Sequence, residues 1–247
     1  MLLKPLAAAM RDGDPVHAII KGTAANNVAG RSSTLTAPDS AAQAEVLSRA
    51  WAKAGVDPIT ISYIEAHGTA TRLGDPIEVE AIDRAFGAVT DRLGFCALSS
   101  VKSNIGHTWS ASGIVGLVKA VLALRHRLLF PTVHATELSP LIDFDKSAVQ
   151  VTREPQPWEP EAGVRRAGVS SFGVMGTNVH AVLEEAPAAP ESPAPSGPCW
   201  FPISAKTPTA LEANLTALRR RLDAHPELRV QDIQRTLVEG RAHYAYR

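Results

Sequence analysis

Three short apolar runs in this sequence each end in a glycine-flanked polar cluster, and this pattern most restricts the fold. The clusters are EAHGTAT at 65–71, SVKSNIGHT at 100–108 and GVSSFGVMGTN at 168–178. The intervening segments at 41–55 and 110–129 are apolar or amphipathic, which is typical of helices. Strands that alternate with helices predict an α/β fold with a largely buried sheet. Loops beyond the strand ends are where sites assemble in such folds.

Further elements follow from local signals. We expect a short helix ending at the Asp12–Gly13 turn, and a helix over 41–55 capped by Ser40 and stopped by Gly55. Asp75 as the N-cap residue and Pro76 in the first turn predict the start of another helix, with Glu78 and Glu80 near the positive end of its dipole. A loop is expected at 23–40. Small residues in 110–129 predict close packing of that helix against other backbone. Strands are expected at 16–22, 59–66, 95–102, 148–152, 165–173 and 179–186.

The composition changes near residue 187. Residues 186–198 hold five prolines and little apolar bulk, which is typical of a linker. We therefore predict a domain over 1–187, a proline-rich linker over 188–198 and a small α/β segment over 199–247. That last segment is expected to contain a strand, a helix beginning at Thr207–Pro208 and a second short helix.

The overall composition argues against several classes of function. Lys+Arg and Asp+Glu both number 25, so no charge excess favours nucleic acid or an anionic membrane. Two cysteines cannot form a disulfide framework, which predicts a cytoplasmic location. No segment has the roughly 18 apolar residues of a membrane span. Metal-binding and nucleotide-binding spacings are also absent, so no metal and no directly bound cofactor are expected.

The three clusters contain the residues best suited to chemistry. His67 ends a strand beside Gly68 and is placed either as a proton donor or as a core histidine. Thr69 and Thr71 offer hydroxyls to an extended ligand, or serve only as turn and cap residues. Lys102 and His107 flank a turn that contains Asn104. Phe172 is either an aromatic gate beside a pocket or a hydrophobic plug on a turn.

These clusters, in this order and spacing, resemble the C-terminal half of the β-ketoacyl synthase domain of modular polyketide synthases. The resemblance covers about residues 2–187, through YIEAHGTATRLGDPIEVEAI, SVKSNIGHT and AGVSSFGVMGTNVHAVLEEAP. Residues 201–247 resemble the start of the adapter that joins ketosynthase to acyltransferase. The resemblance implies a thiolase-like fold, of which this chain supplies the C-terminal half, and a homodimer of the complete domain.

The resemblance also implies a reaction, decarboxylative Claisen condensation between thioesters carried on acyl carrier protein. By position, His67 and His107 match the two active-site histidines, and Lys102 matches the lysine that supports them. Thr69 and Thr71 match the residues that contact the phosphopantetheine arm, and Phe172 matches the gating aromatic residue. We include Asn104 among the expected substrate-binding residues. Antibiotic biosynthesis is the expected type of pathway.

The sequence departs from the family pattern in four ways. The usual HGTGT is HGTAT, with Ala70 adding a methyl group to a tight loop. Trp109 follows GHT, where a polar or small residue is usual. The gate turn reads GVMGTN in place of a commoner form. The family's nucleophilic cysteine, in an Asp-Thr-Ala-Cys-Ser-Ser type of motif, has no counterpart here; Cys96 is expected to be buried and structural, and Cys199 has no base nearby in the sequence.

Three hypotheses follow. The chain is an enzyme part that becomes active with an N-terminal half from elsewhere; or it is a non-catalytic module that binds carrier protein or scaffolds a synthase; or it decarboxylates malonyl thioester without condensation, which we rank lowest. The expected partners are acyl carrier protein and the missing N-terminal half of the ketosynthase, with a neighbouring synthase subunit as the alternative for a scaffold.

Overall fold

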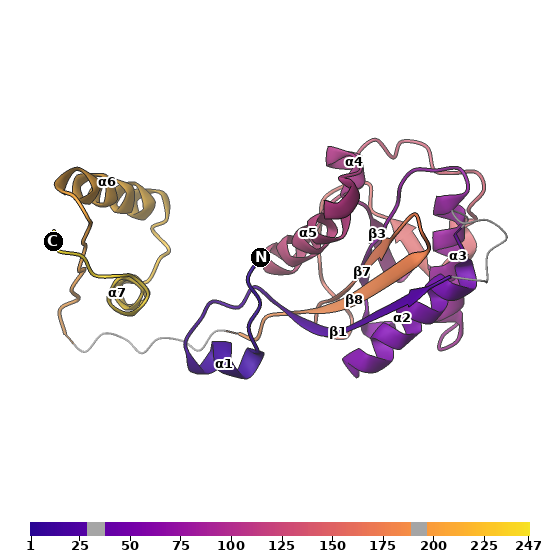
Figure 1. Cartoon of the computed structure of the whole chain (residues 1–247), viewed down its shortest axis with the longest axis horizontal. Helices are drawn as coiled ribbons and strands as arrows, with labels where there is room; N and C mark the ends of the chain where they lie inside the picture. The colour runs from indigo at the N-terminus through magenta and orange to yellow at the C-terminus, as the bar shows by residue number, and fades with distance from the viewer. Residues whose placement is uncertain (29–37, 189–196) are drawn as a thin grey trace. The chain divides into compact units, whose positions relative to one another are not determined.

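The computed structural model describes residues 1–28, 38–188 and 197–247, and these divide into two compact units, Met1–Pro187 and Ala188–Arg247. The first unit is built on a six-stranded mixed sheet (Figure 1). From edge to edge its strands are β1 (Ala18–Asn27), β8 (Thr177–Glu185), β7 (Arg166–Phe172), β2 (Tyr63–Glu65), β3 (Cys96–Ser99) and β5 (Val149–Val151). β1, β8 and β7 pair antiparallel, whereas β7, β2, β3 and β5 run parallel. The α/β class predicted from the alternation of elements is confirmed.

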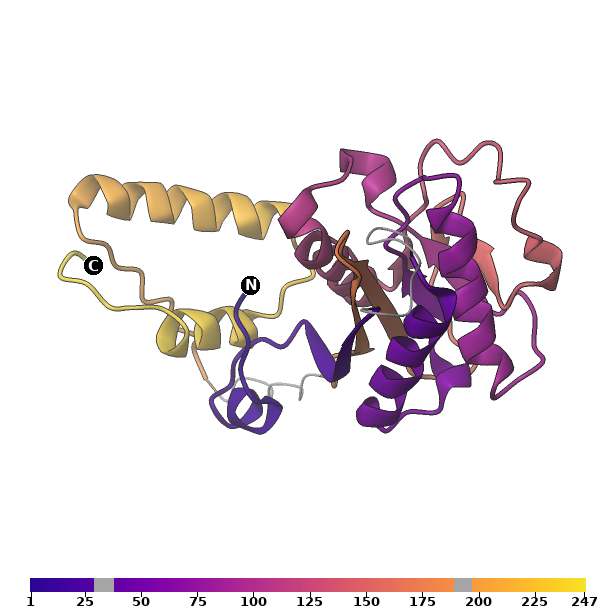
Figure 2. The same ribbon diagram turned by 45° about the vertical axis from the view of Figure 1, so that its right-hand side comes forward.

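Helices cover both faces of this sheet. On one face α2 (Ser40–Ala54) and α3 (Gly74–Gly87) lie side by side (Figure 2) and enclose a core that includes Leu47, Phe86 and Ile64. On the other face α5 (Ser112–His126) packs on β7, β8 and β2, over a second core with Tyr63 and Trp158. Burial on both faces explains why the parallel strands read as short apolar runs.

The remaining elements of the first unit are short. They are α1 (Leu6–Arg11), α4 (Lys102–Ile105), the two-stranded sheet of β4 (Leu128–Leu129) and β6 (Gln156–Pro157), and 3₁₀ turns at Pro58–Thr60, Trp109–Ala111 and Phe144–Lys146.

Two helix predictions differ from the structure in detail. α2 is capped by Asp39 and not by Ser40, because the Asp39 carboxylate accepts the backbone N–H of Ala42 at 2.6 Å. Gly55 ends the helix as expected, in the left-handed conformation with φ of 62°. α3 begins at Gly74, so Asp75 lies inside the first turn and is not the N-cap residue.

Strand β1 is longer than the sequence predicts. Residues 23–27, expected as a loop, pair with β8, and the Nδ2 of Asn178 donates to Oδ1 of Asn26 at 3.0 Å. This side-chain bond and the backbone hydrogen bonds between β1 and β8 give partners to polar residues that otherwise favour turns. The rest of the expected loop, 29–37, lies outside the described residues. The strand expected over 59–66 is in fact a 3₁₀ turn at Pro58–Thr60 followed by β2.

The small residues of α5 permit its close approach to the sheet, as predicted. A Cβ added at Gly116 would lie 3.2 Å from Cγ of Glu65, and one at Gly113 would lie 3.0 Å from Oγ of Ser171. The neighbours are therefore strand side chains, whereas the sequence pattern predicts backbone.

Over residues 197–247 the second unit contains two helices, α6 (Pro208–Ala224) and α7 (Val230–Glu239). Thr207 caps α6 by accepting the N–H of Ala210 at 3.2 Å, as predicted from Thr-Pro. The strand expected after residue 199 is wrong: only an isolated bridge joins Ala205 to Tyr246. Most of the predicted linker, 189–196, lies outside the described residues. No helix among the described residues is long and apolar enough to cross a membrane.

Candidate active site

The parallel strands β2, β3 and β7 direct their carboxyl ends to one edge of the sheet, and the three polar clusters meet there. The backbone N–H of Ala66 donates to the carbonyl of Ser99 at 2.8 Å, which joins the first cluster to the second. β7 pairs parallel to β2 and ends at Phe172, in the third cluster. Strand order and direction thus bring together segments that are far apart in sequence.

The turn after β2 is held by a buried carboxylate. Glu78 of α3 accepts the backbone N–H groups of His67 at 2.7 Å and of Gly68 at 2.8 Å. Burial raises the pKa of Glu78 to about 7, against the lowering effect of these two bonds. From the sequence, Glu78 is expected only to interact with the helix dipole. Its position on the buried face of α3, four residues before Ile82, was the available signal.

His67 is half-buried among aromatic rings. Its ring centroid lies 5.4 Å from that of His107 and 5.5 Å from that of Phe172. Its buried Nδ1 has no hydrogen-bond partner among the described residues. Burial, and then repulsion from Lys102 and His107, lowers the pKa of His67 to about 4. The imidazole is therefore neutral near pH 7 and retains one N–H donor.

His107 is exposed and makes a directional bond with the residue two positions on. Its Nδ1 accepts the backbone N–H of Trp109 at 3.0 Å. In the neutral ring the accepting nitrogen carries no proton, so the proton resides on Nε2. The Trp109 ring centroid lies 5.6 Å from that of His107, which extends the row of rings to four, in the order Phe172, His67, His107 and Trp109.

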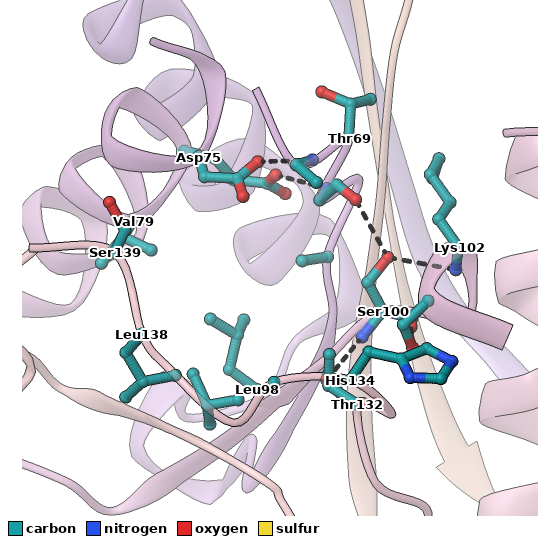
Figure 3. Close-up of a pocket in the computed structure, with 18 of the residues that line it drawn as sticks. Thr69, Asp75, Val79, Leu98, Ser100, Lys102, Thr132, His134, Leu138 and Ser139 are labelled. Atoms are coloured by element: carbon teal, nitrogen blue, oxygen red, sulfur yellow. Dashed lines mark hydrogen bonds between the residues drawn. The ribbon is translucent and has the colours of Figure 1, made fainter. Parts of the chain in front are cut away.

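Lys102 begins α4, is half-buried, and acts electrostatically on His67. Burial lowers the pKa of Lys102, opposed by the nearby carboxylates of Glu78, Glu65 and Asp75. Ser100 links the lysine to the first cluster: its Oγ accepts the N–H of Lys102 and donates to the carbonyl of Gly68, both at 3.4 Å (Figure 3).

A buried ionic network lies behind this loop and was not predicted from the sequence. The Glu65 carboxylate forms an ion pair with Lys119 of α5 at 2.9 Å. It also accepts hydrogen bonds from the O–H of Tyr63 at 2.5 Å and from the backbone N–H of Val101 at 2.6 Å. Lys119 also donates to Ser99 Oγ. The network connects α5 to β2, β3 and the residue that precedes Lys102. A charged residue at the end of an apolar strand, and another within an apolar helix, were the signals.

The threonines differ in their surroundings. Their hydroxyl oxygens lie 3.5 Å apart, but Thr71 Oγ1 also accepts the N–H of Gly74 at 3.0 Å, which is the cap role considered as its alternative. Between them Ala70 has a φ of 57°, and its N–H donates to Asp75 at 3.1 Å. The methyl group noted in the sequence therefore lies on a left-handed residue.

Two cavities flank these residues. One of about 390 Å³ is lined by His67, Thr69, Thr71, His107, Trp109 and Phe172, with Gln43 and Asn178 also in its wall. The other, of about 440 Å³, is lined by Thr69, Lys102 and His107 and by the loop that carries His134 and Leu138 (Figure 3). Asn104 lines neither cavity; its exposed side chain accepts Ser103 Oγ at 3.3 Å. The structure thus gathers the other predicted site residues and leaves Asn104 outside.

Cys96 does not line the candidate site. Cys96 is fully buried in β3, as predicted, and burial raises the pKa of its thiol well above the usual range. Cys199 is a free thiol in the second unit. Within the described residues, no three His, Cys, Asp or Glu side chains form a group able to hold a metal ion.

Family models match almost the whole chain. Residues 17–136 match the β-ketoacyl synthase C-terminal domain, and residues 139–247 match the ketoacyl-synthetase C-terminal extension. The second match begins inside the first structural unit, so the family division and the structural division at 187 do not coincide.

Similar proteins come from modular synthases. A phenolphthiocerol/phthiocerol polyketide synthase protein of Mycobacterium tuberculosis is 48% identical over 248 residues, which cover 98% of this chain and 17% of that protein. Erythronolide synthase EryA2 of Saccharopolyspora erythraea is 44% identical over 248 residues, which cover 100% of this chain and 7% of its own length. The chain therefore spans less than a fifth of either relative.

Solved structures give the same result for the fold. The ketosynthase from module 6 of the bacillaene synthase of Bacillus subtilis is 38% identical, with a TM-score of 0.84 over 98% of this chain and 42% of that one. An oxazolomycin ketosynthase domain from a Streptomyces albus strain is 34% identical, with a TM-score of 0.86 over 98% of this chain and 43% of its own. The thiolase-like fold is confirmed, and the chain belongs to the β-ketoacyl synthase family as the C-terminal part of a polyketide synthase ketosynthase domain.

Proposed function

We propose that this chain supplies the histidine half of a ketosynthase active site for decarboxylative Claisen condensation. In that reaction the bond between the malonyl α-carbon and its carboxylate breaks and CO₂ leaves. The resulting enolate attacks an acyl thioester on a cysteine, a carbon–carbon bond forms, and the cysteine thiolate leaves. The observation that carries this proposal is the pair of imidazoles, His67 and His107, 5.4 Å apart on one cavity wall.

The histidines act as hydrogen-bond donors. The low pKa of His67, about 4, supports this role because an uncharged imidazole has one N–H to direct at a developing oxyanion. His107 offers its Nε2 proton, since Nδ1 is occupied by the N–H of Trp109. Lys102 contributes positive charge near His67, which also favours negative charge on the substrate oxygen.

The substrates reach the site on the phosphopantetheine arm of acyl carrier protein. Thr69 and Thr71 line the cavity that holds both histidines and are suited to bond the amides of such an arm, while Phe172 gates it beside His67. No cofactor is bound directly in this proposal. A cytoplasmic location agrees with two cysteines that are both free thiols.

The nucleophilic cysteine comes, in this proposal, from the N-terminal half of the domain, in a longer form of the same protein or in another chain. An apolar stripe on α5 supports this, because Ile114, Val118 and Leu122 are 47%, 43% and 39% exposed on the helix side away from the sheet core. The chain aligns with about two fifths of a solved ketosynthase, so the rest of that domain is the proposed cover for the stripe, and the complete domain is proposed to dimerise.

The test is a complete ketosynthase in which the N-terminal half of the Mycobacterium tuberculosis relative precedes this chain. We expect acyl loading and condensation, measured by mass spectrometry of the carrier protein. His67→Ala and His107→Ala should each retain loading and lower condensation by about 10²–10³-fold, as for loss of an oxyanion donor. A folded chimera that neither loads nor condenses would contradict the proposal.

The second candidate is a non-catalytic module that binds carrier protein or scaffolds a synthase. The exposed apolar stripe on α5 also suits a scaffold. It predicts that carrier protein binds the chain while His67→Ala and His107→Ala leave product formation unchanged, so the same variants distinguish the two functions.

A further inference from the structure

Trp109 occupies a position that folding alone does not favour. Its side chain is 75% exposed, and its backbone adopts the left-handed region with a φ of 51°. A bulky residue in this region is strained, and an exposed indole contributes little to the core. This strained and exposed residue lines the cavity that contains the two histidines. Strain of this kind persists where the surrounding structure enforces it, which is frequent at active sites.

The contacts of Trp109 converge on His107. The left-handed backbone directs the Trp109 N–H to Nδ1 of His107 at 3.0 Å. The same residue places its ring 5.6 Å from the imidazole, with 30° between the planes. The His67 ring packs edge-on against His107, with 88° between their planes. The rings of His67 and Trp109 therefore both restrict rotation of the His107 imidazole.

We propose that the indole of Trp109 is a positioning element for His107. This inference rests on the proposed function. The backbone bond fixes which nitrogen carries the proton, but an exposed imidazole can still tilt about that single bond. The adjacent indole limits the tilt and keeps Nε2–H in one direction, toward the substrate oxygen. Small misplacements of a catalytic group lower rates steeply, so this packing acts on the rate through the position of His107.

Variants separate the indole from the backbone. Trp109→Ala retains the backbone N–H and removes only the ring, and Trp109→Phe retains an aromatic surface. Trp109→Gly also relieves the left-handed strain. The matched control is Trp200→Ala, because Trp200 is 74% exposed and lies in the other unit.

In the complete chimeric ketosynthase, we expect Trp109→Ala to lower kcat for condensation by roughly 10–100-fold, with KM changed less than about two-fold. Trp109→Phe should recover most of the loss, and Trp200→Ala should have no effect. Trp109→Gly should raise the unfolding temperature, because glycine relieves the left-handed strain, and should lower kcat, because the indole is lost. Unchanged kcat in Trp109→Ala, or a loss matched by weaker packing between the two halves in limited proteolysis, would overturn the inference.

A second measurement needs no catalysis. In this chain labelled with ¹⁵N-histidine, and with His107 assigned by a His107→Gln variant, the wild type should show a single Nε2–H tautomer. Trp109→Ala should keep this tautomer, because the backbone N–H is retained, but should broaden the His107 ring resonances as the imidazole tilts, and Trp109→Phe should sharpen them again. Identical spectra in all three proteins would refute positioning. If the chimera loads acyl groups but does not condense, the proposed function fails, and these spectra still decide the role of Trp109.

Discussion

Oε1 of Glu78 accepts the backbone N–H of His67 at 2.7 Å, so a helix carboxylate sets the position of a candidate catalytic turn. The second oxygen takes the N–H of Gly68 at 2.8 Å, and the side chain is 5% exposed. The two buried donors would lack partners without it. The geometry of the histidine thus depends on a residue 11 positions along the chain, in another element.

Replacing Glu78 should therefore weaken both stability and activity. Glu78→Gln retains one acceptor oxygen and loses the other, so one buried N–H loses its acceptor, at a cost of about 1–3 kcal/mol in the free energy of unfolding. Urea denaturation measures this. The control is Glu80→Gln, on the exposed face of the same helix, and an equal effect in both variants would exclude a special role for Glu78.

The pH dependence of stability should carry opposite contributions from Glu78 and His67. The pKa of folded Glu78 is raised to about 7 from 4.5, so the native state binds the extra proton and this group's contribution falls as pH rises from 4.5 to 7. The pKa of folded His67 is lowered to about 4 from 6.5, so its contribution is lost as pH falls from 6.5 to 4.

Urea denaturation at several pH values separates the two contributions. Glu78→Gln should make stability rise more steeply between pH 4.5 and 6.5 than in the wild type, and His67→Gln should make it rise less. Parallel pH profiles for all three proteins would contradict both assignments.

Lys102 should tune the titration of His67. Repulsion by the ammonium group contributes to the lowered pKa of His67, after burial, so Lys102→Met is expected to raise that pKa from about 4 toward 6.5. NMR titration of the imidazole measures the change. Lys53→Met, in the exposed part of α2, is the control and should leave His67 unchanged. A constant His67 pKa in Lys102→Met would mean that burial and His107, without Lys102, account for the lowered pKa.

Ala70→Gly should stabilise the chain. An L-residue in the left-handed region costs roughly 1–2 kcal/mol, and the greater unfolded-chain entropy of glycine offsets part of this gain, leaving about 0.5–1 kcal/mol. The same substitution at Ala52, exposed within α2, should instead destabilise by about 1 kcal/mol. Thermal unfolding of both variants gives the two signs, and a loss of stability in Ala70→Gly would show that the methyl group has a favourable contact.

The buried pair of Glu65 and Lys119 should be sensitive to removal of one partner. Lys119→Met leaves a carboxylate that is 1% exposed without its counter-ion, at an expected cost of about 3–5 kcal/mol. Arg49→Met breaks an exposed pair with Glu45 at 3.5 Å and should cost less than about 1 kcal/mol. If urea denaturation gives similar values for both, the buried network contributes little.

Local sequence signals determined much of the first unit. Apolar runs and helix spacing predicted α2, α3, α5 and the short parallel strands, because burial on one face or both imposes a period on the side chains. Gly55 predicted a helix end because the left-handed conformation there suits glycine. The polar clusters, together with their resemblance to a family, predicted His67 and His107 as neighbours, and their rings are 5.4 Å apart.

Other features depended on tertiary structure. The extension of β1 comes from pairing with β8, where Asn26 and its partner Asn178 are 152 positions apart, a separation that local propensity cannot encode. The apolar surroundings of Glu78 and Glu65 in the sequence are a sign of burial, but only packing against a turn and against Lys119 gives them their partners. The sequence by itself determined which residues are available for the chemistry. The tertiary structure decided which of them are neutral, buried and directed at one another, because these properties arise from contacts between distant segments.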